Sequence, residues 1–104
     1  MSYYANPDER SRLIRGLHEL ADFLAKNPEV PAPRWADLMV FPPNGTDAEM
    51  FADVDVIAEL IGTTASDADS PAGHYTAARH FGPVQYRAIA IPNSASYDKN
   101  GEAE

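Results

Sequence analysis

The chain has 104 residues, 44% of them apolar and 23% charged, and a formal net charge of −8, which suits an ordinary acidic globular domain. It contains no cysteine, so a disulfide framework, a thiolate metal site and a cysteine nucleophile are excluded. Its first ten residues lack the pattern of a secretory signal, and no apolar run approaches the ~18 residues of a membrane span. We therefore expect a soluble, cytoplasmic protein that does not contact membranes.

The first predicted element is a helix that begins after Asn6 and ends at Asn27. Asn6 is a favourable N-cap, Pro7 suits the first helical position, and Glu9 can complete a capping box. Apolar residues then recur at helical spacing, and these are Leu13, Ile14, Leu17, Leu20, Ala21 and Leu24. The pattern predicts an amphipathic helix.

Residues 28–36 hold three prolines and are predicted to form an extended connector. Residues 37–41 then form a predicted strand. Because the run from Leu38 to Phe41 is apolar without interruption, we expect this strand to be buried on both faces and to lie inside the sheet. Residues 42–45, with the sequence PPNG, predict a turn.

A second helix is predicted from the capping box of Thr46 and Glu49 to Gly62. Its apolar stripe consists of Met50, Phe51, Val54, Ile57, Ala58 and Ile61. Residues 63–66 are predicted to form a further strand, and residues 67–73 a loop.

Residues 74–91 are predicted to form a β-hairpin around Gly82 and Pro83. Glycine adopts the positive φ that the first position of a type II′ loop needs, and proline suits the second. This loop pairs Phe81 with Val84, Arg79 with Tyr86, Ala77 with Ala88, and Tyr75 with Ala90. The alanines indicate that a helix approaches the ribbon closely, although neither face is clearly the one that meets the core.

These elements predict an α+β fold with the order α-β-α-β-β-β. The simplest arrangement places two amphipathic helices on one face of a small, mostly antiparallel four-stranded sheet. We expect one globular domain over residues 1–92 and a disordered acidic tail over residues 93–104.

The hairpin is the first candidate binding site, because it concentrates aromatic and cationic side chains in an acidic chain. The candidate ligand-binding residues are His74, Tyr75, Arg79, His80, Tyr86 and Arg87. Arg79, opposite Tyr86, could stack its guanidinium on the tyrosine ring. The cluster could bind an anionic ligand or an acidic peptide, or it could simply neutralise the carboxylates of residues 47–69.

The second candidate is the side of the second helix that faces away from its apolar stripe. No lysine or arginine occurs between Arg34 and Arg79, and the candidate partner-binding residues in this interval are Glu49, Asp53, Asp55, Val56 and Glu59. This acidic face could dock on a basic protein surface, could imitate the phosphates of a nucleic acid, or could serve only solubility. It disfavours direct binding of nucleic acid, which requires cationic side chains.

No catalytic or metal-binding motif is present in the sequence. There is no GxSxG elbow, no HExxH and no phosphate-binding glycine loop. His74 and His80 share a predicted face but lie about 20 Å apart along a strand, too far to bind one ion together. We expect no cofactor and no metal, and the missing motifs favour a non-enzymatic protein without deciding whether any catalysis occurs.

The segment from Gly73 to Pro92, together with the helical sequence LHELADFL at residues 17–24, resembles small proteins of high-GC actinobacteria and their phages. The shared pattern is GHYTA, R.FGPV, YRA and a final IP. This group has no assigned activity, so the resemblance implies none, although a phage or plasmid origin would favour the mimic.

The sequence thus favours a non-enzymatic domain that binds another protein with a basic surface. The alternatives are an inhibitor that mimics nucleic acid, and a binder of a small anionic ligand at the hairpin. The pattern indicates no oligomeric state.

Overall fold

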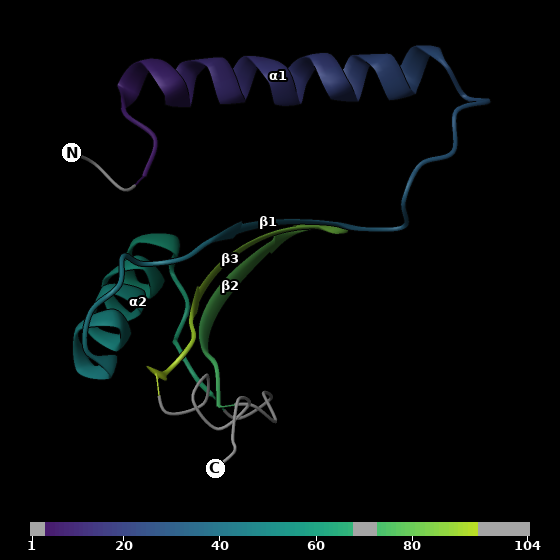
Figure 1. The fold of residues 1–104 in the computed structure, drawn as a ribbon. Helices are drawn as coiled ribbons and strands as arrows, with labels where there is room; N and C mark the ends of the chain where they lie inside the picture. The colour runs from purple at the N-terminus through teal and green to yellow at the C-terminus, as the bar shows by residue number, and fades with distance from the viewer. Residues whose placement is uncertain (1–3, 68–72, 94–104) are drawn as a thin grey trace. The chain divides into compact units, whose positions relative to one another are not determined.

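The structure is a computed structural model that describes residues 4–67 and 73–93. The chain divides into two compact units, Met1–Arg34 and Trp35–Glu104. The first unit contains helix α1, and the second contains a three-stranded sheet and helix α2 (Figure 1). The described elements therefore have the order α-β-α-β-β, which confirms the α+β class.

Helix α1 spans Pro7–Lys26, so both predicted ends are confirmed. The Asn6 side chain accepts a 2.8 Å hydrogen bond from the Glu9 amide, and the Glu9 carboxylate accepts one of 2.9 Å from the Asn6 amide. No residue of α1 is buried. The five largest exposed apolar side chains of α1 are 45–53% exposed, and these are Leu13, Ile14, Leu17, Leu20 and Phe23.

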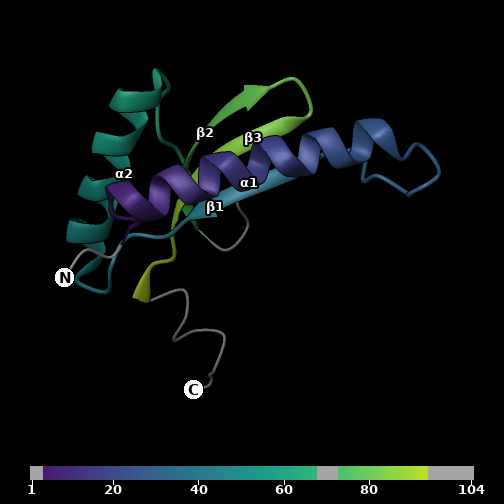
Figure 2. The ribbon, with the colours of Figure 1, turned by 90° about the horizontal axis from the view of Figure 1, so that it is seen from above.

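The sheet of the second unit contains three strands in the order β1-β3-β2. Strand β1 is Ala36–Val40, β2 is Tyr75–Phe81 and β3 is Val84–Ala90. Strand β3 lies between the other two, parallel to β1 and antiparallel to β2 (Figure 2). The sheet is therefore mixed.

The prediction of a fourth strand at residues 63–66 is wrong. Only Ser66 pairs, in an isolated antiparallel bridge with Thr76 whose two hydrogen bonds measure 2.9 and 3.0 Å. The preceding residues leave the helix through Gly62, which has a φ of +78° and closes the helix end. The segment after Gly62 thus reaches the sheet at one residue pair instead of running beside it.

The prediction that residues 37–41 form an inner strand is also wrong. Strand β1 lies at the edge of the sheet, and β3 is the inner strand. The uninterrupted apolar run predicts burial on both faces, but Leu38, Met39 and Phe41 are 38%, 47% and 41% exposed. An apolar sequence therefore marks an exposed edge here.

The hairpin prediction is confirmed in both its loop and its register. Gly82 has a φ of +63°, which is the conformation that the turn requires. Strands β2 and β3 pair in the predicted register, from Phe81 opposite Val84 to Tyr75 opposite Ala90.

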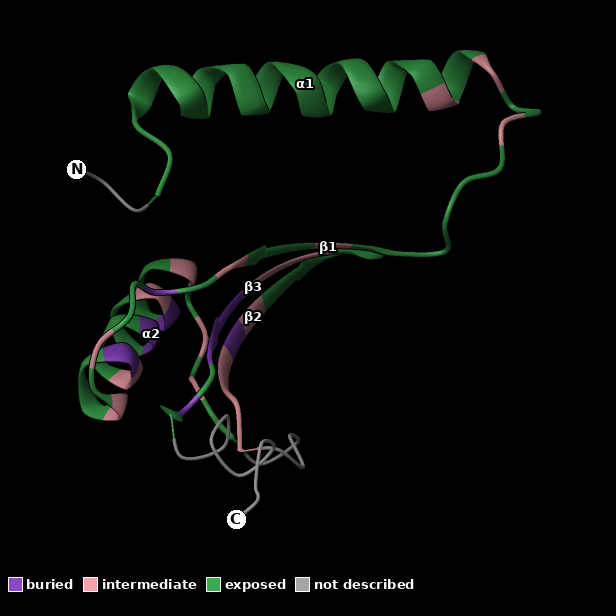
Figure 3. Ribbon diagram, in the orientation of Figure 1, coloured by how far each residue is buried: buried purple, intermediate pink, exposed green. Residues whose placement is uncertain are grey.

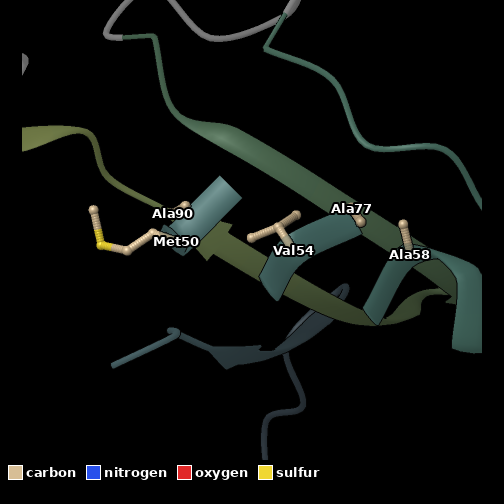
Figure 4. Packing of buried hydrophobic residues seen from close by; sticks show 5 residues of the cluster. All are labelled: Met50, Val54, Ala58, Ala77 and Ala90. Carbon is tan, nitrogen blue, oxygen red and sulfur yellow. The ribbon is translucent and has the colours of Figure 1, made fainter. Parts of the chain in front are cut away.

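Helix α2 spans Asp47–Ile61 and packs against β2 and β3. Its predicted capping box is present: the Glu49 amide donates to the Thr46 hydroxyl, and the Glu49 carboxylate accepts from the Thr46 amide. The core cluster consists of Met50, Val54, Ala58, Ala77 and Ala90, with Val54 fully buried (Figure 4). Buried residues gather where α2 meets the sheet, whereas most of β1 and the hairpin turn are exposed (Figure 3).

The close approach of a helix to the alanines of the hairpin is therefore confirmed for α2. That the first helix covers the same face stays a prediction. No helix among residues 4–67 and 73–93 has the length and apolarity needed to cross a bilayer.

Of the predicted tail, only Asn93 lies among the described residues. Its backbone amide donates a 2.7 Å hydrogen bond to the Asp47 carboxylate, and its side-chain amide donates one of 3.0 Å to the Gly45 carbonyl. Asn93 thus ties the end of the sheet to the start of α2. Residues 94–104 lie outside the described part of the chain.

Two valines of α2 give a matched test of this packing. Val54→Ala should lower the free energy of unfolding by about 2 kcal/mol, because it removes two methyl groups from a filled site. Val56→Ala, on the outer side of the same helix where the valine is 57% exposed, should change it by less than about 0.5 kcal/mol. Urea denaturation followed by circular dichroism measures both values, and equal losses would contradict the packing.

Candidate functional site

The two faces of the sheet differ in what covers them. The face that carries Tyr75, Ala77 and Ala90 packs against α2. Because side chains alternate along a strand, Thr76, Ala78 and their neighbours belong to the opposite face. The structure therefore settles which face of the hairpin meets the core.

This alternation divides the predicted hairpin site. Tyr75, Arg79 and Tyr86 lie on the α2 face, while His80 and Arg87 lie on the opposite one. His74 immediately precedes β2. The sheet thus divides the predicted site between its two faces.

Tyr75 is held within the domain by two contacts with α2. Its hydroxyl donates a 2.6 Å hydrogen bond to the Asp55 carboxylate, and its ring stacks on Phe51 with 4.6 Å between centroids. The hydrogen bond to Asp55, together with burial and the negative charges of Asp55 and Asp67, raises the pKa of Tyr75 above its ordinary value. Tyr75 therefore fastens β2 to α2.

Arg79 lies at the exposed end of the same face. It is opposite Tyr86 as predicted, but the ring over which its guanidinium lies is that of Phe81, with 5.1 Å from the guanidinium carbon to the ring centroid. Phe81 is 56% exposed. This cation–π contact is therefore a surface contact beside the turn.

The opposite face holds a polar cluster that the sequence did not reveal. Arg87 donates to the Asp37 carboxylate, and the Gln85 side-chain amide donates to the same carboxylate over 3.2 Å. Arg87 also contacts the Met39 sulfur at 3.6 Å. The Asp37 side chain is only 11% exposed. The ion pair thus links β1 to β3 on the face away from α2.

Burial alone would raise the pKa of Asp37, but its surroundings reverse that effect. The hydrogen bonds from Gln85 and Arg87, with the positive charges of Arg87 and His80, hold its pKa below the ordinary value of 3.8. Asp37 is consequently ionised at neutral pH and compensates the charge of Arg87. Any anion that binds Arg87 has to compete with this carboxylate.

The outward side of α2 presents an apolar pair with carboxylates on both sides of it. Val56 and Leu60 lie one helical turn apart and are 57% and 79% exposed. Helical spacing places Asp53 on one side of this pair and Asp55 and Glu59 on the other, while Glu49 lies in line with the pair toward the start of the helix. We call the set of Glu49, Asp53, Asp55, Val56, Glu59 and Leu60 the outer face of α2. Leu60 was missed in the sequence, although its spacing from Val56 is a usable signal.

The four carboxylates of the outer face differ in what they contact. Glu49 belongs to the capping box, and Asp55 accepts the hydrogen bond of Tyr75. Asp53 and Glu59 are exposed and form no ion pair within the described residues. These last two are therefore available to a partner.

A shallow open depression of about 350 Å³ adjoins the outer face at the C-terminal half of α2. Its lining consists of Asp55, Val56, Ala58, Glu59, Thr63, Thr64 and Ala65. The Thr63 hydroxyl oxygen is buried without a hydrogen-bond partner among the described residues. The last turn of α2 holds no basic residue, so the negative end of its dipole adds to the two carboxylates.

Among residues 4–67 and 73–93, no three histidine or acidic side chains are placed to hold a metal ion together. No family model matches the sequence, and neither a curated protein nor a solved structure matches the chain.

Asp37→Asn should lower the free energy of unfolding at neutral pH, since it removes the charge that pairs with Arg87. Folding lowers the pKa of Asp37, so its contribution is present above the ordinary value of 3.8 and is lost as pH falls through the folded pKa. The stability difference between wild type and variant should therefore shrink in acid. Denaturation at several pH values measures it, with Asp53→Asn as the exposed, unpaired control; a difference independent of pH would contradict the pairing.

Tyr75→Phe should cost about 0.5–1 kcal/mol at neutral pH, because it deletes the hydrogen bond to Asp55 and keeps the stacked ring. Folding raises the pKa of Tyr75, so this contribution is present below the ordinary value of 10.0 and is lost as pH rises through the folded pKa. Thermal denaturation at neutral and alkaline pH tests both points, with Tyr86→Phe as the control on the same face.

Proposed function

We propose that this chain is a non-enzymatic binding domain that docks another protein on the outer face of α2. The observation that carries the proposal is the exposed pair of Val56 and Leu60 with carboxylates along both sides. The matching partner surface is an apolar pocket bordered by lysine or arginine. Such a helix face in a groove is a recurring mode of recognition.

The two apolar side chains supply the anchor of this interface. Full burial of each is worth roughly 1.5–3 kcal/mol, which falls short of the ~8 kcal/mol of a micromolar complex. The partner must therefore also engage the carboxylates or the adjoining depression. Exposed charges at the rim chiefly raise the association rate and select the partner.

The depression beside Asp55 and Glu59 supports the choice of a basic partner. A lysine or arginine side chain entering it meets the carboxylates of Asp55 and Glu59 and the negative end of the α2 dipole. Lysine and arginine can also lay their methylene stems along Val56. An acidic or purely apolar partner would leave these groups without compensation.

The two alternatives have less support. A mimic of nucleic acid calls for an unbroken row of free carboxylates, whereas here an apolar pair divides the row and Tyr75 holds Asp55. A ligand site at the hairpin calls for free cations, whereas Asp37 compensates Arg87 and the other candidates lie on two faces. Both alternatives stay predictions.

Leu60→Ala should weaken partner binding by about tenfold or more, because Leu60 is the most exposed apolar side chain of the face and the partner buries it on binding. The measurement is quantitative capture of lysate proteins on immobilised wild type and variant, followed by calorimetry with the captured protein. Leu20→Ala is the matched control, since Leu20 is 53% exposed on α1.

Glu59→Lys and added salt should each slow the association of the same partner, because they remove or screen its attraction to the carboxylates. A partner that tolerates Leu60→Ala and Glu59→Lys but is lost with Leu20→Ala would show that α1 is the binding surface and would overturn the proposal.

A further inference from the structure

The outer edge of β1 differs from the outer edge of β2, which is the other edge of the described sheet. No described strand pairs with it, while the outer edge of β2 is occupied at Thr76 by the bridge to Ser66. Natural edge strands are usually protected by lysine, proline or a bulge. Strand β1 has no lysine or proline, and its one charge, Asp37, is 11% exposed and directed to Arg87.

Large apolar side chains gather along this unprotected edge. Trp35, which immediately precedes β1, is 67% exposed, and Phe41, which follows it, is 41% exposed. Leu38 and Met39 between them are 38% and 47% exposed. The edge thus combines free backbone groups with apolar surface on both faces of the sheet.

The backbone groups available for pairing follow from one hydrogen bond. The Ala36 amide donates to the Pro83 carbonyl over 3.1 Å, which directs Ala36 toward β3. Alternate residues of a parallel strand bond to the same neighbour, so the amide and carbonyl groups of Asp37 and Met39 point outward. Asp37 and Met39 are therefore the positions at which an added strand can bond.

We propose that the occupant of this edge is β1 of a second copy of the chain, paired antiparallel about a two-fold axis at Leu38. In this register Asp37 lies opposite Met39 of the second copy, and each pair exchanges two backbone hydrogen bonds. Leu38 lies opposite its own counterpart. The two three-stranded sheets join into one sheet of six strands, with a self-complementary interface.

Charge and overlap select this register over its neighbours. A two-fold axis at Asp37 would place the two Asp37 carboxylates directly opposite, which is destabilising. An axis at Met39 would pair Ala36 with Pro42 and shorten the overlap of the strands. With the axis at Leu38, every residue of Ala36–Val40 lies opposite a residue of the same segment in the second copy.

The same register also pairs the exposed aromatic residues. Trp35 lies opposite Phe41 of the second copy, at both ends of the interface and on one face of the sheet. Cross-strand aromatic pairs are among the favourable contacts of antiparallel sheets. Trp35, Leu38 and Phe41 of each copy thus lie opposite apolar side chains of the other copy. Met39 lies opposite Asp37.

The test is sedimentation equilibrium of the full chain over a range of concentrations. Wild type should approach twice the chain mass of 11.3 kDa, and added salt should favour the dimer because both copies are strongly acidic. This response is opposite to that of the proposed α2 complex, so the two proposals fail separately. A wild type that stays monomeric at every concentration overturns the dimer.

Met39→Pro removes an outward amide and leaves the bonds from β1 to β3 in place, so it should give a monomer with the circular dichroism of the wild type. Met39→Val, which keeps that amide, should still dimerise. A folded Met39→Pro variant that dimerises like the wild type overturns the proposal and points to the stripe of α1 or to the hairpin.

Variants with a single introduced cysteine test the register independently of Met39→Pro. The wild-type chain has no cysteine that could interfere. Leu38→Cys should form a covalent dimer under mild oxidation, because residues at the centre of the pair lie ~5 Å apart. Ala36→Cys should not, because the two substituted positions would lie about 13 Å apart. Equal cross-linking of the two variants, or none from Leu38→Cys, overturns the register.

Discussion

The contact of Val54 with Ala77 and Ala90 is the constraint on which the second unit depends. Alanines on β2 and β3 let the backbone of α2 approach the sheet closely, and Val54 fills the space that remains, with no exposed surface. A larger residue at Ala77 would separate the two layers. Because this contact uses one side of α2, the opposite side with Val56 and Leu60 must face outward. The core therefore determines the candidate interaction surface.

Strand β3 is the second organising element, since it pairs with both other strands. Its alternating side chains serve the two faces differently: Ala88 and Ala90 are buried, while Gln85 and Arg87 hold Asp37 of β1. The polar cluster attaches β1 to β3 through side chains on the face away from α2. Asp37 is the one charged residue of β1, and because its carboxylate pairs with Arg87 it does not protect the outer edge of the strand. One ion pair thus both attaches the edge strand and leaves it open to pairing.

Local signals in the sequence predicted most of the elements, and long-range pairing was the part they missed. The capping residues Asn6 and Thr46 and the turn at Gly82 act through neighbours a few residues away, so the helix ends and the hairpin register were confirmed. The ion pair of Asp37 and Arg87 joins residues 50 positions apart, and no periodicity encodes a parallel register. For the same reason the edge position of β1 was predicted wrongly. At the candidate site, the acidic residues of α2 were evident, whereas the exposure of Leu60 depended on how the helix is rotated against the sheet.

The two helices show how the same local pattern can have different energetic consequences. Both begin with a capping box and carry an apolar stripe, yet α2 buries Met50, Val54 and Ala58 while α1 has no buried residue. Most helical stability in proteins comes from packing of the apolar face against other elements and not from intrinsic helix propensity. The caps and the exposed pair of Asp8 and Arg12 contribute little by comparison. Helix α2 is therefore stabilised by the sheet that it covers, and a surface that covers the apolar stripe of α1 would stabilise that helix in the same way.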